Sequence, residues 1–170
     1  MLSGYSRFLD GIERVLYWIL AFLIGAMTLV MIYQVVLRYV FNNANIWAEE
    51  LIKFMFIWSV MLGGCIAVRK NSHLRIEVFI DMLSPAKKAW IQIVTYSLVM
   101  AFLAVLLVLG LVLVSNTTVN RSAGLGVPMA IPYFSVPLGA FLMMLACVEF
   151  MLKNVEGARQ RGASLSSGKD

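Results

Sequence analysis

The chain has 170 residues, of which 61% are hydrophobic and only 14% are charged, with a net charge of +5 at pH 7 and a mean hydropathy of +0.86. Soluble domains are about half apolar and about a quarter charged, and a globule of this size has too little interior to bury so many apolar side chains. The composition therefore excludes a soluble enzyme core, a disordered chain and a nucleic-acid-binding domain, and it makes the net charge an indicator of membrane topology.

Four long apolar segments predict an all-α integral membrane protein with four spanning helices. The first uncharged run covers 23 residues, Val15 to Leu37, and as a helix it is roughly 34 Å long, enough to cross a hydrocarbon core of about 30 Å. The run is longer than the apolar region of a signal peptide, and no small-residue cleavage pattern follows it, so we expect a retained helix. The last span is expected to begin after Pro128, because proline is tolerated at a first turn but not inside a helix. We predict spans over residues 15–37, 46–68, 89–114 and 131–152.

The lysines and arginines predict the orientation of these helices. Eleven of the 14 lie in the N-terminal segment, in the loop between helices two and three, or in the C-terminal tail, and three lie on the other side. The positive-inside rule then places both termini in the cytoplasm. Residues 76–83 of the loop form a short amphipathic segment, which either lies on the inner leaflet or caps the helix ends. We expect one domain over residues 1–156 and a disordered cytoplasmic tail over residues 157–170.

The residues that carry chemistry in other small membrane proteins are scarce. A bis-histidine haem needs two histidines on facing helices, and the chain has only His73, in the cytoplasmic loop, which argues against the anchor subunit of a redox complex. Cys65 and Cys147 both fall near cytoplasmic helix ends, where we expect buried apolar thiols and not a redox pair. We therefore expect no catalytic residue, no bound metal and no cofactor in this chain.

The one polar constellation surrounds the short external turn between helices one and two. Glu49 and Lys53 stand four residues apart in the favourable order and can pair along the helix. Glu50 lacks such a partner, and Arg38 at the end of the first helix is the nearest candidate. The carboxylate is either an ion-coupling group or half of a clamp that fixes the hairpin. Trp47 suits an anchor at the membrane interface.

Two further features of the second helix indicate contacts with a neighbour. Four apolar residues share one face, which is open to lipid or to a partner: Trp47, Leu51, Phe54 and Trp58. Gly63 and Gly64 permit another helix to approach closely near its cytoplasmic end.

These residues also carry a family resemblance. The ordered set Gln34-Val-Val-Leu-Arg-Tyr-Val-Phe-Asn42, Trp47-Ala-Glu-Glu-Leu51, Phe56-Ile-Trp58, Gly63-Gly64 and His73-Leu-Arg-Ile-Glu-Val-Phe79 resembles the small, DctQ-like membrane subunit of tripartite ATP-independent periplasmic (TRAP) transporters. The resemblance covers the first two helices and the following loop, and the segment from Pro132 to Gly139 is similar to the family's entry into helix four.

The resemblance implies a division of labour among three proteins. A large membrane permease subunit holds the substrate and sodium sites and moves the substrate. A soluble periplasmic binding protein delivers an organic acid. The small subunit acts as a scaffold that widens the immobile part of the permease and contributes to docking, and in the family pattern His73 helps to hold the cytoplasmic loop in place.

A second function remains open at this point, a small self-sufficient proton-coupled exporter of the multidrug type that acts as a dimer. Such a protein needs a membrane-embedded carboxylate in its pathway. Helix one has no carboxylate in its uncharged run, and Glu49 and Glu50 stand at a helix end.

Overall fold

The computed structural model describes residues 2–43, 45–71, 85–149 and 151. The helices are α1 (Leu2–Val40), α2 (Ile46–Asn71), α4 (Pro85–Asn116) and α5 (Ala130–Tyr133). After a one-residue interruption, helix resumes over residues 135–149, and we call Ala130–Glu149 the last span. Four helices are long and apolar enough to cross a membrane: Tyr5–Val40, Ile46–Lys70, Val94–Asn116 and Ala130–Glu149. The predicted all-helical fold with four spans is confirmed.

The helix α1 begins much earlier than the uncharged run that predicts it. The helix starts at Leu2, so it includes four charged residues before that run: Arg7, Asp10, Glu13 and Arg14. Since none of these residues breaks a helix, the backbone continues through them, and both carboxylates pair with Arg69 on α2. The amphipathic segment predicted over residues 76–83 and the tail over residues 157–170 lie outside the described residues.

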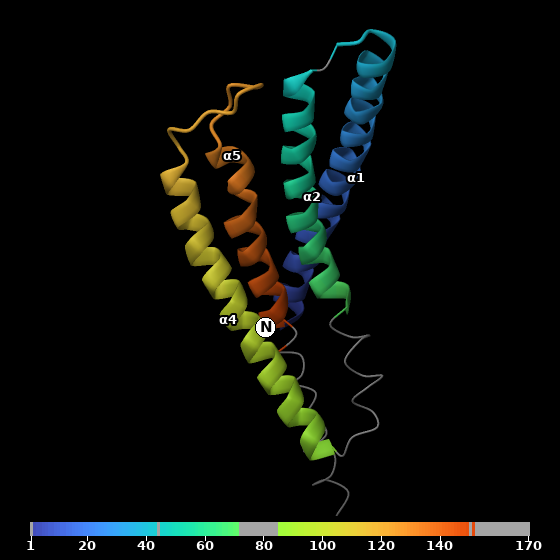
Figure 1. Ribbon diagram of the computed structural model, residues 1–170. Coiled ribbons are helices and arrows are strands. Elements are labelled where there is room, and N and C mark those ends of the chain that lie inside the picture. Colours follow the sequence, from blue (N-terminus) through green and yellow to red (C-terminus); the bar gives the residue numbers. More distant parts are fainter. Residues whose placement is uncertain (1, 44, 72–84, 150, 152–170) are drawn as a thin grey trace, which may run out of the picture.

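The helices form two antiparallel hairpins that meet along one line (Figure 1). The helix α1 packs along α2, α4 packs against α5, and α2 also contacts α5. The α1–α2 turn and the loop over residues 117–129 lie at one end, which we call the turn end. The N-terminus, the end of α2 and the end of the last span lie toward the other end, which we call the Arg69 end.

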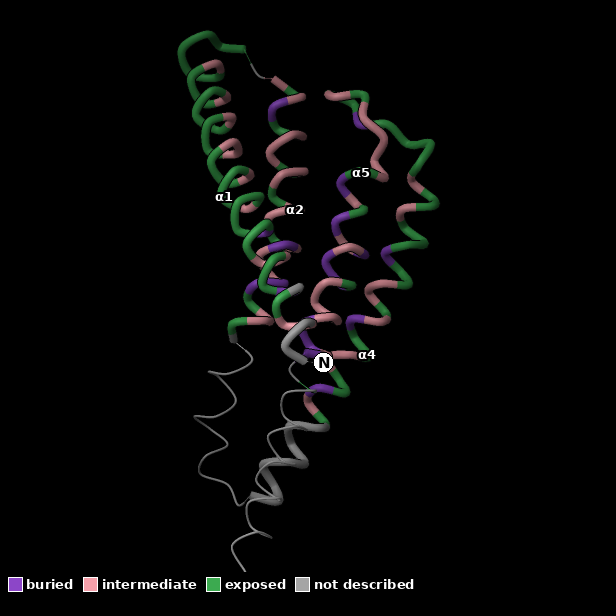
Figure 2. The backbone as a smooth tube through the Cα atoms, turned by 180° about the vertical axis from the view of Figure 1, so that it is seen from behind, coloured by how far each residue is buried: buried purple, intermediate pink, exposed green. Residues whose placement is uncertain are grey.

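The buried interior of the described chain is small and lies where the hairpins meet (Figure 2). One cluster joins α1 and α2 through Leu16, Leu62, Cys65 and Ile66. A second cluster joins α4 and the last span through Leu103, Ala140 and Cys147. Both cysteines are therefore buried among apolar side chains, as expected.

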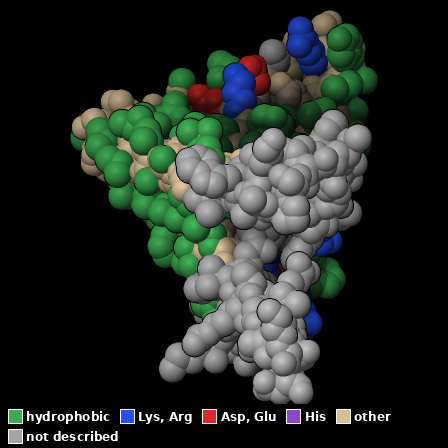
Figure 3. All heavy atoms as spheres, turned by 90° about the horizontal axis from the view of Figure 1, so that it is seen from below, with side chains coloured by type: hydrophobic (Ala, Val, Ile, Leu, Met, Phe, Trp, Pro, Cys, Tyr) green, Lys and Arg blue, Asp and Glu red, His purple; other side chains and the backbone are tan. Residues whose placement is uncertain are grey.

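The outer faces of α1 and α4 expose large apolar side chains. Trp18 is 75% exposed, Phe22 is 71% exposed and Leu98 is 70% exposed. Seen from below, hydrophobic side chains cover much of the described flank, while acidic and basic side chains gather at its edges (Figure 3). Such continuous apolar surface is unstable in water, and it fits the hydrocarbon of a bilayer.

Glycines bring the last span close to its neighbours. A Cβ atom added at Gly64 would lie 2.6 Å from Cε of Met143, so this α2 glycine faces the last span. A Cβ atom added at Gly139 would lie 2.9 Å from Cβ of Met61. Gly63 differs, since its added Cβ would meet only Leu20 at the ordinary distance of 3.8 Å. The close crossing therefore depends on Gly139, since the contact at Gly64 is with the flexible end of Met143, which can move.

We expect Gly139→Ala to destabilise the chain, because the new methyl group collides with the stem of Met61 and not with its flexible end. Overpacking of this kind costs about 1–3 kcal/mol. Gly25→Ala is the matched control, since an added Cβ there meets nothing within 4 Å and alanine favours a helix. Thermal unfolding in detergent should show a lower midpoint for Gly139→Ala only, and equal midpoints for the two variants would contradict the close crossing.

Candidate functional site

At the turn end, the carboxylate of Glu50 holds the loop that connects α4 to α5. Its Oε2 atom accepts hydrogen bonds from the backbone N–H groups of Gly124, at 2.9 Å, and of Leu125, at 3.1 Å. We call this arrangement the Glu50 contact. Backbone N–H groups that converge on a carboxylate give charge-assisted hydrogen bonds, which are stronger than neutral ones. The contact therefore fixes the first turn of α2 against a loop more than 70 residues away in sequence.

The loop is shaped by its own backbone before it meets Glu50. Arg121 and Pro128 form an isolated antiparallel bridge, and the N–H of Ser122 donates to the carbonyl of Val127 at 2.9 Å. The guanidinium of Arg121 also donates to the carbonyl of Gly126 at 3.0 Å, and Gly126 has a φ of 67°, which favours glycine. The loop is thus a closed turn that presents two N–H groups to α2.

The backbones of Trp47 and Gly124 lie close together at the Glu50 contact. A Cβ atom added at Gly124 would lie 2.8 Å from both Cα and N of Trp47. Only glycine fits there without a shift of the backbone. The indole of Trp47 packs on Tyr33 of α1, with ring centroids 5.9 Å apart. Trp47 thus joins α1, α2 and the loop at the turn end.

The predicted pairing of Arg38 with Glu50 is wrong. Within the described residues, Arg38 forms no ion pair, and its guanidinium carbon lies 6.0 Å from the ring centroid of Tyr39. Glu50 instead accepts hydrogen bonds from backbone N–H groups of the loop. The pairing of Glu49 with Lys53 is present at 2.7 Å, but both side chains are exposed, so it contributes little to stability.

The remaining predicted residues lie farther along α2 or beyond it. Trp58 is half-buried against the α1–α2 cluster, so its indole packs inside the α1–α2 hairpin. His73 lies outside the described residues.

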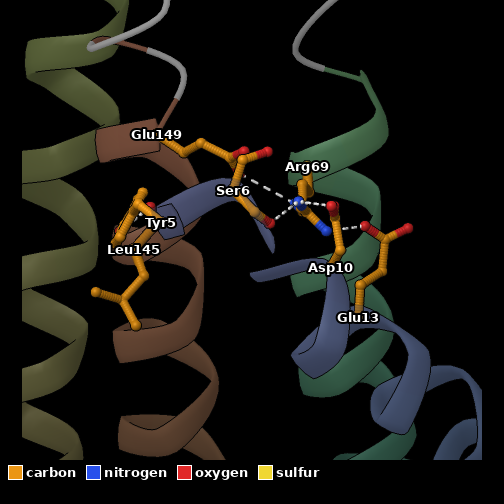
Figure 4. Close-up of polar contacts among 7 residues, drawn as sticks. All are labelled: Tyr5, Ser6, Asp10, Glu13, Arg69, Leu145 and Glu149. Carbon is orange, nitrogen blue, oxygen red and sulfur yellow. Dashed lines mark hydrogen bonds and ion pairs between the residues drawn. The ribbon is translucent and has the colours of Figure 1, made fainter. Parts of the chain in front are cut away.

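At the Arg69 end, one arginine binds three carboxylates from two other helices (Figure 4). Arg69 of α2 pairs with Asp10 of α1 at 2.5 Å, with Glu13 of α1, and with Glu149 of the last span at 3.1 Å. It also donates to the carbonyl of Ser6 at 3.4 Å. We call Arg69, Asp10, Glu13 and Glu149 the Arg69 cluster. It ties together three of the four spans.

Burial makes the Arg69 cluster important for stability. The side chain of Arg69 is 13% exposed and that of Glu149 only 4%. A buried charge is costly without a partner, so each of these two groups depends on the other. Nearby, the hydroxyl of Tyr5 donates to the carbonyl of Leu145 at 3.0 Å, which adds a second tie between α1 and the last span.

Sequence reasoning missed the Arg69 cluster, although a signal for it exists. Glu149 is the only charged residue between Arg121 and Lys153, and it lies near the end of the apolar run of the last span. A carboxylate in such a place needs a partner. Asp10 and Glu13 face the same side of α1 three residues apart, which offers an arginine two oxygens from one helix.

Comparison with known proteins decides the family. The family model described as "Tripartite ATP-independent periplasmic transporters, DctQ component" matches residues 27–157. This chain belongs to the DctQ component family. The matched region includes the Glu50 contact, Arg69 and Glu149, whereas Asp10 and Glu13 precede it.

Three relatives illustrate the similarity within the DctQ family and around it. The C4-dicarboxylate TRAP transporter small permease protein DctQ of Vibrio cholerae is 34% identical over 106 residues, which are 62% of this chain and 44% of that protein. The chain therefore spans less than half of that relative. The sialic acid TRAP transporter small permease protein SiaQ of Vibrio cholerae is 24% identical over 148 residues, 87% of this chain and 84% of that protein. The sialic acid TRAP transporter permease protein SiaT of Haemophilus influenzae is 36% identical over 81 residues, 48% of this chain and 12% of that protein. The relatives are transporter proteins and not enzymes.

Proposed function

We propose that this chain is the small scaffold subunit of a TRAP transporter in a bacterial inner membrane, and that it has no transport pathway of its own. The observation that carries the proposal is the position of the charged side chains. In the part of the chain that the structure describes, the Glu50 contact and the Arg69 cluster lie at opposite ends, and the middles of the spans hold no charged residue. A carboxylate or a coupling ion that crosses a membrane needs polar partners at mid-depth.

The partner that would supply this pathway is a large permease subunit. In SiaT, the segment similar to this chain is 12% of a longer permease protein. This similarity supports the pairing of the chain with a larger permease. The scaffold role agrees with a bundle whose helices are tied at both ends. The sodium coupling that drives uptake belongs, in this proposal, to the large subunit.

The cargo of the complex is proposed to be an organic acid. Two relatives are named for C4-dicarboxylates and for sialic acid, and both of these are carboxylates. A periplasmic binding protein would deliver the acid to the turn end of the bundle. There the loop exposes Val119, 87% exposed, and Arg121, which offer it a mixed apolar and cationic surface.

The alternative of a self-sufficient exporter loses its main candidate residue. Glu50 is held by backbone N–H groups at a helix end, and Glu49 is paired with Lys53. Neither carboxylate stands at mid-membrane, where a proton-coupled exporter needs one.

Purification of the tagged chain from its source membranes tests the proposal. We expect a larger membrane protein with many spans to co-elute with it in a fixed ratio. Elution as a homodimer that binds no larger membrane protein would contradict the scaffold role. Variants with Lys53→Gln serve as a control that should leave the ratio unchanged, since the Glu49–Lys53 pair is exposed.

The orientation of the bundle is open to a direct test with alkaline phosphatase, which is active only outside the cytoplasm. Fusions after Asn43 and after Asn120, both at the turn end, are expected to be active. A fusion after Arg75 should be inactive, because the positive-inside rule places the Arg69 end in the cytoplasm. The reverse pattern of activities would show the opposite orientation.

A further inference from the structure

The loop that connects α4 to α5 holds its own hydrogen-bond donors in place. The backbone N–H of Ser122 donates to the carbonyl of Val127 at 2.9 Å, and the N–H of Gly126 donates to the carbonyl of Ser122 at 3.0 Å. The guanidinium of Arg121 closes the same turn on the carbonyl of Gly126 at 3.0 Å. All of these bonds lie within the loop, so its turn does not need a side chain from another helix to form.

Two consecutive N–H groups of this turn converge on one point. The N–H groups of Gly124 and Leu125 both donate to Oε2 of Glu50, at 2.9 Å and 3.1 Å. Successive backbone N–H groups that point to the same place form a concave anion site. We call the N–H groups of Gly124 and Leu125 the loop nest. Because the loop shapes itself, the nest keeps its donors together when the side chain of Glu50 is absent.

The charge around the loop nest favours an anion. Residues 38–53 and 117–130, which surround the two turns at this end, carry three cations and two carboxylates, so their net charge is +1. Without the carboxylate of Glu50 this net charge becomes +2. The charged residues in these two ranges are Arg38, Glu49, Glu50, Lys53 and Arg121.

The loop nest can be reached from water once the side chain of Glu50 is removed. Gly124 and its neighbour Ala123 are exposed, and Glu50 is only half-buried. Replacement of Glu50 by alanine removes a carboxylate and one methylene group, which together have the size of an acetate ion. A free acetate ion therefore fits the position that the carboxylate leaves.

We infer that the loop nest is a carboxylate-binding site, which Glu50 fills in the unaltered chain and which binds a free small carboxylate, such as acetate, when residue 50 lacks one. Carboxylate oxygens accept charge-assisted hydrogen bonds from N–H groups, whereas chloride is larger and a weaker acceptor. In the unaltered chain, Glu50 keeps free organic acids out of the site, because its carboxylate is tethered beside the donors. The site does not depend on the role of the chain in transport.

Acetate rescue of Glu50→Ala, in the full chain in detergent, tests the inference. We expect this variant to lower the thermal midpoint by about 2–4 °C, the shift typical of one lost hydrogen bond in a chain of this size. Sodium acetate should then raise the midpoint of the variant progressively, since a ligand that binds only the folded chain stabilises it by mass action. Sodium chloride at the same ionic strength should leave the loss in place.

Two further variants locate the effect. Glu49→Ala is the matched control, because it removes a neighbouring carboxylate that is exposed and pairs with Lys53, so acetate should change its midpoint no more than that of the unaltered chain. Glu50→Ala combined with Gly124→Val should lose the rescue, since a Cβ atom at residue 124 would lie 3.0 Å from the position of Oε2 of Glu50.

Several results would overturn the inference. A midpoint of Glu50→Ala equal to that of the unaltered chain would show that the nest contributes nothing, and failure of acetate to raise a lowered midpoint would show that it binds no free carboxylate. An equal rescue by chloride would remove the preference for carboxylates. An equal gain for Glu49→Ala, or a rescue that survives Gly124→Val, would place the effect of acetate outside the loop nest.

Discussion

Replacement of Arg69 by glutamine is expected to lower the free energy of unfolding by about 3 kcal/mol, the lower end of the range for a broken buried ion pair. The variant leaves Glu149, 4% exposed, and Glu13, 21% exposed, without their common cation. Asp10 is 64% exposed and can be solvated, which keeps the loss from being larger. Unfolding by denaturing detergent, followed by circular dichroism, measures the change.

Two further variants show whether the loss comes from the uncompensated charge. Addition of Glu149→Gln to Arg69→Gln should restore part of the stability, since it removes the most buried of the three carboxylates. Arg7→Gln, an exposed cation near the same end with no described ion pair, should change stability by less than about 0.5 kcal/mol. An Arg69→Gln variant as stable as the unaltered chain would contradict the tie between the three spans.

Replacement of Gly124 by valine is expected to detach the loop over residues 117–129 from the start of α2. The new Cβ atom would lie 2.8 Å from the backbone of Trp47 and 3.0 Å from Oε2 of Glu50, so the loop must move and the hydrogen bonds to Glu50 are lost. Overpacking against backbone costs about 1–3 kcal/mol. We expect less of the large permease subunit to co-purify with this variant, which gel densitometry of the complex measures.

The neighbouring Ala123 supplies the control for Gly124→Val. Its side chain is exposed, so Ala123→Val places a valine in the same loop without reaching α2. Glu50→Ala should resemble Gly124→Val, because it removes the acceptor of the same hydrogen bonds. Charge reversal of Glu50 should not be rescued by reversal of Arg38, since the two side chains do not pair. A rescue by Arg38, or equal complexes from the two valine variants, would contradict the Glu50 contact.

The sequence predicts the helices well because the physics that forms them is local. An uncharged run of sufficient length must be helical in a bilayer, where each backbone polar group needs an internal partner. The Glu49–Lys53 pair and the close approach at Gly64 follow from positions along one helix, and the structure contains both. The N-terminal extension of α1 over charged residues is less evident, because charges mark the end of a span but not the end of a helix.

The partners of Glu50 and of Arg69 depend on how the hairpins meet, which spacing along one helix does not specify. Glu50 binds backbone N–H groups, and any residue type could have supplied them, so no side-chain pattern points to Gly124 and Leu125. Arg69 appears in the sequence as one of the eleven cations that the positive-inside rule counts on one side of the membrane. Arg69 joins the spans because it pairs with Glu149. In the sequence, the charge of Glu149 near the end of an apolar span was the sign that an ion-pair partner is needed.

The central claim is that this chain supports a transport pathway located in another subunit. Proteoliposomes that contain the chain alone, the large permease subunit alone, both subunits, or neither provide the most direct test. The assay follows uptake of labelled C4-dicarboxylate and sialic acid under a sodium gradient, with the periplasmic binding protein present. Uptake of a carboxylate only when both membrane subunits are present is the predicted result. Uptake by liposomes that hold this chain alone would contradict the claim.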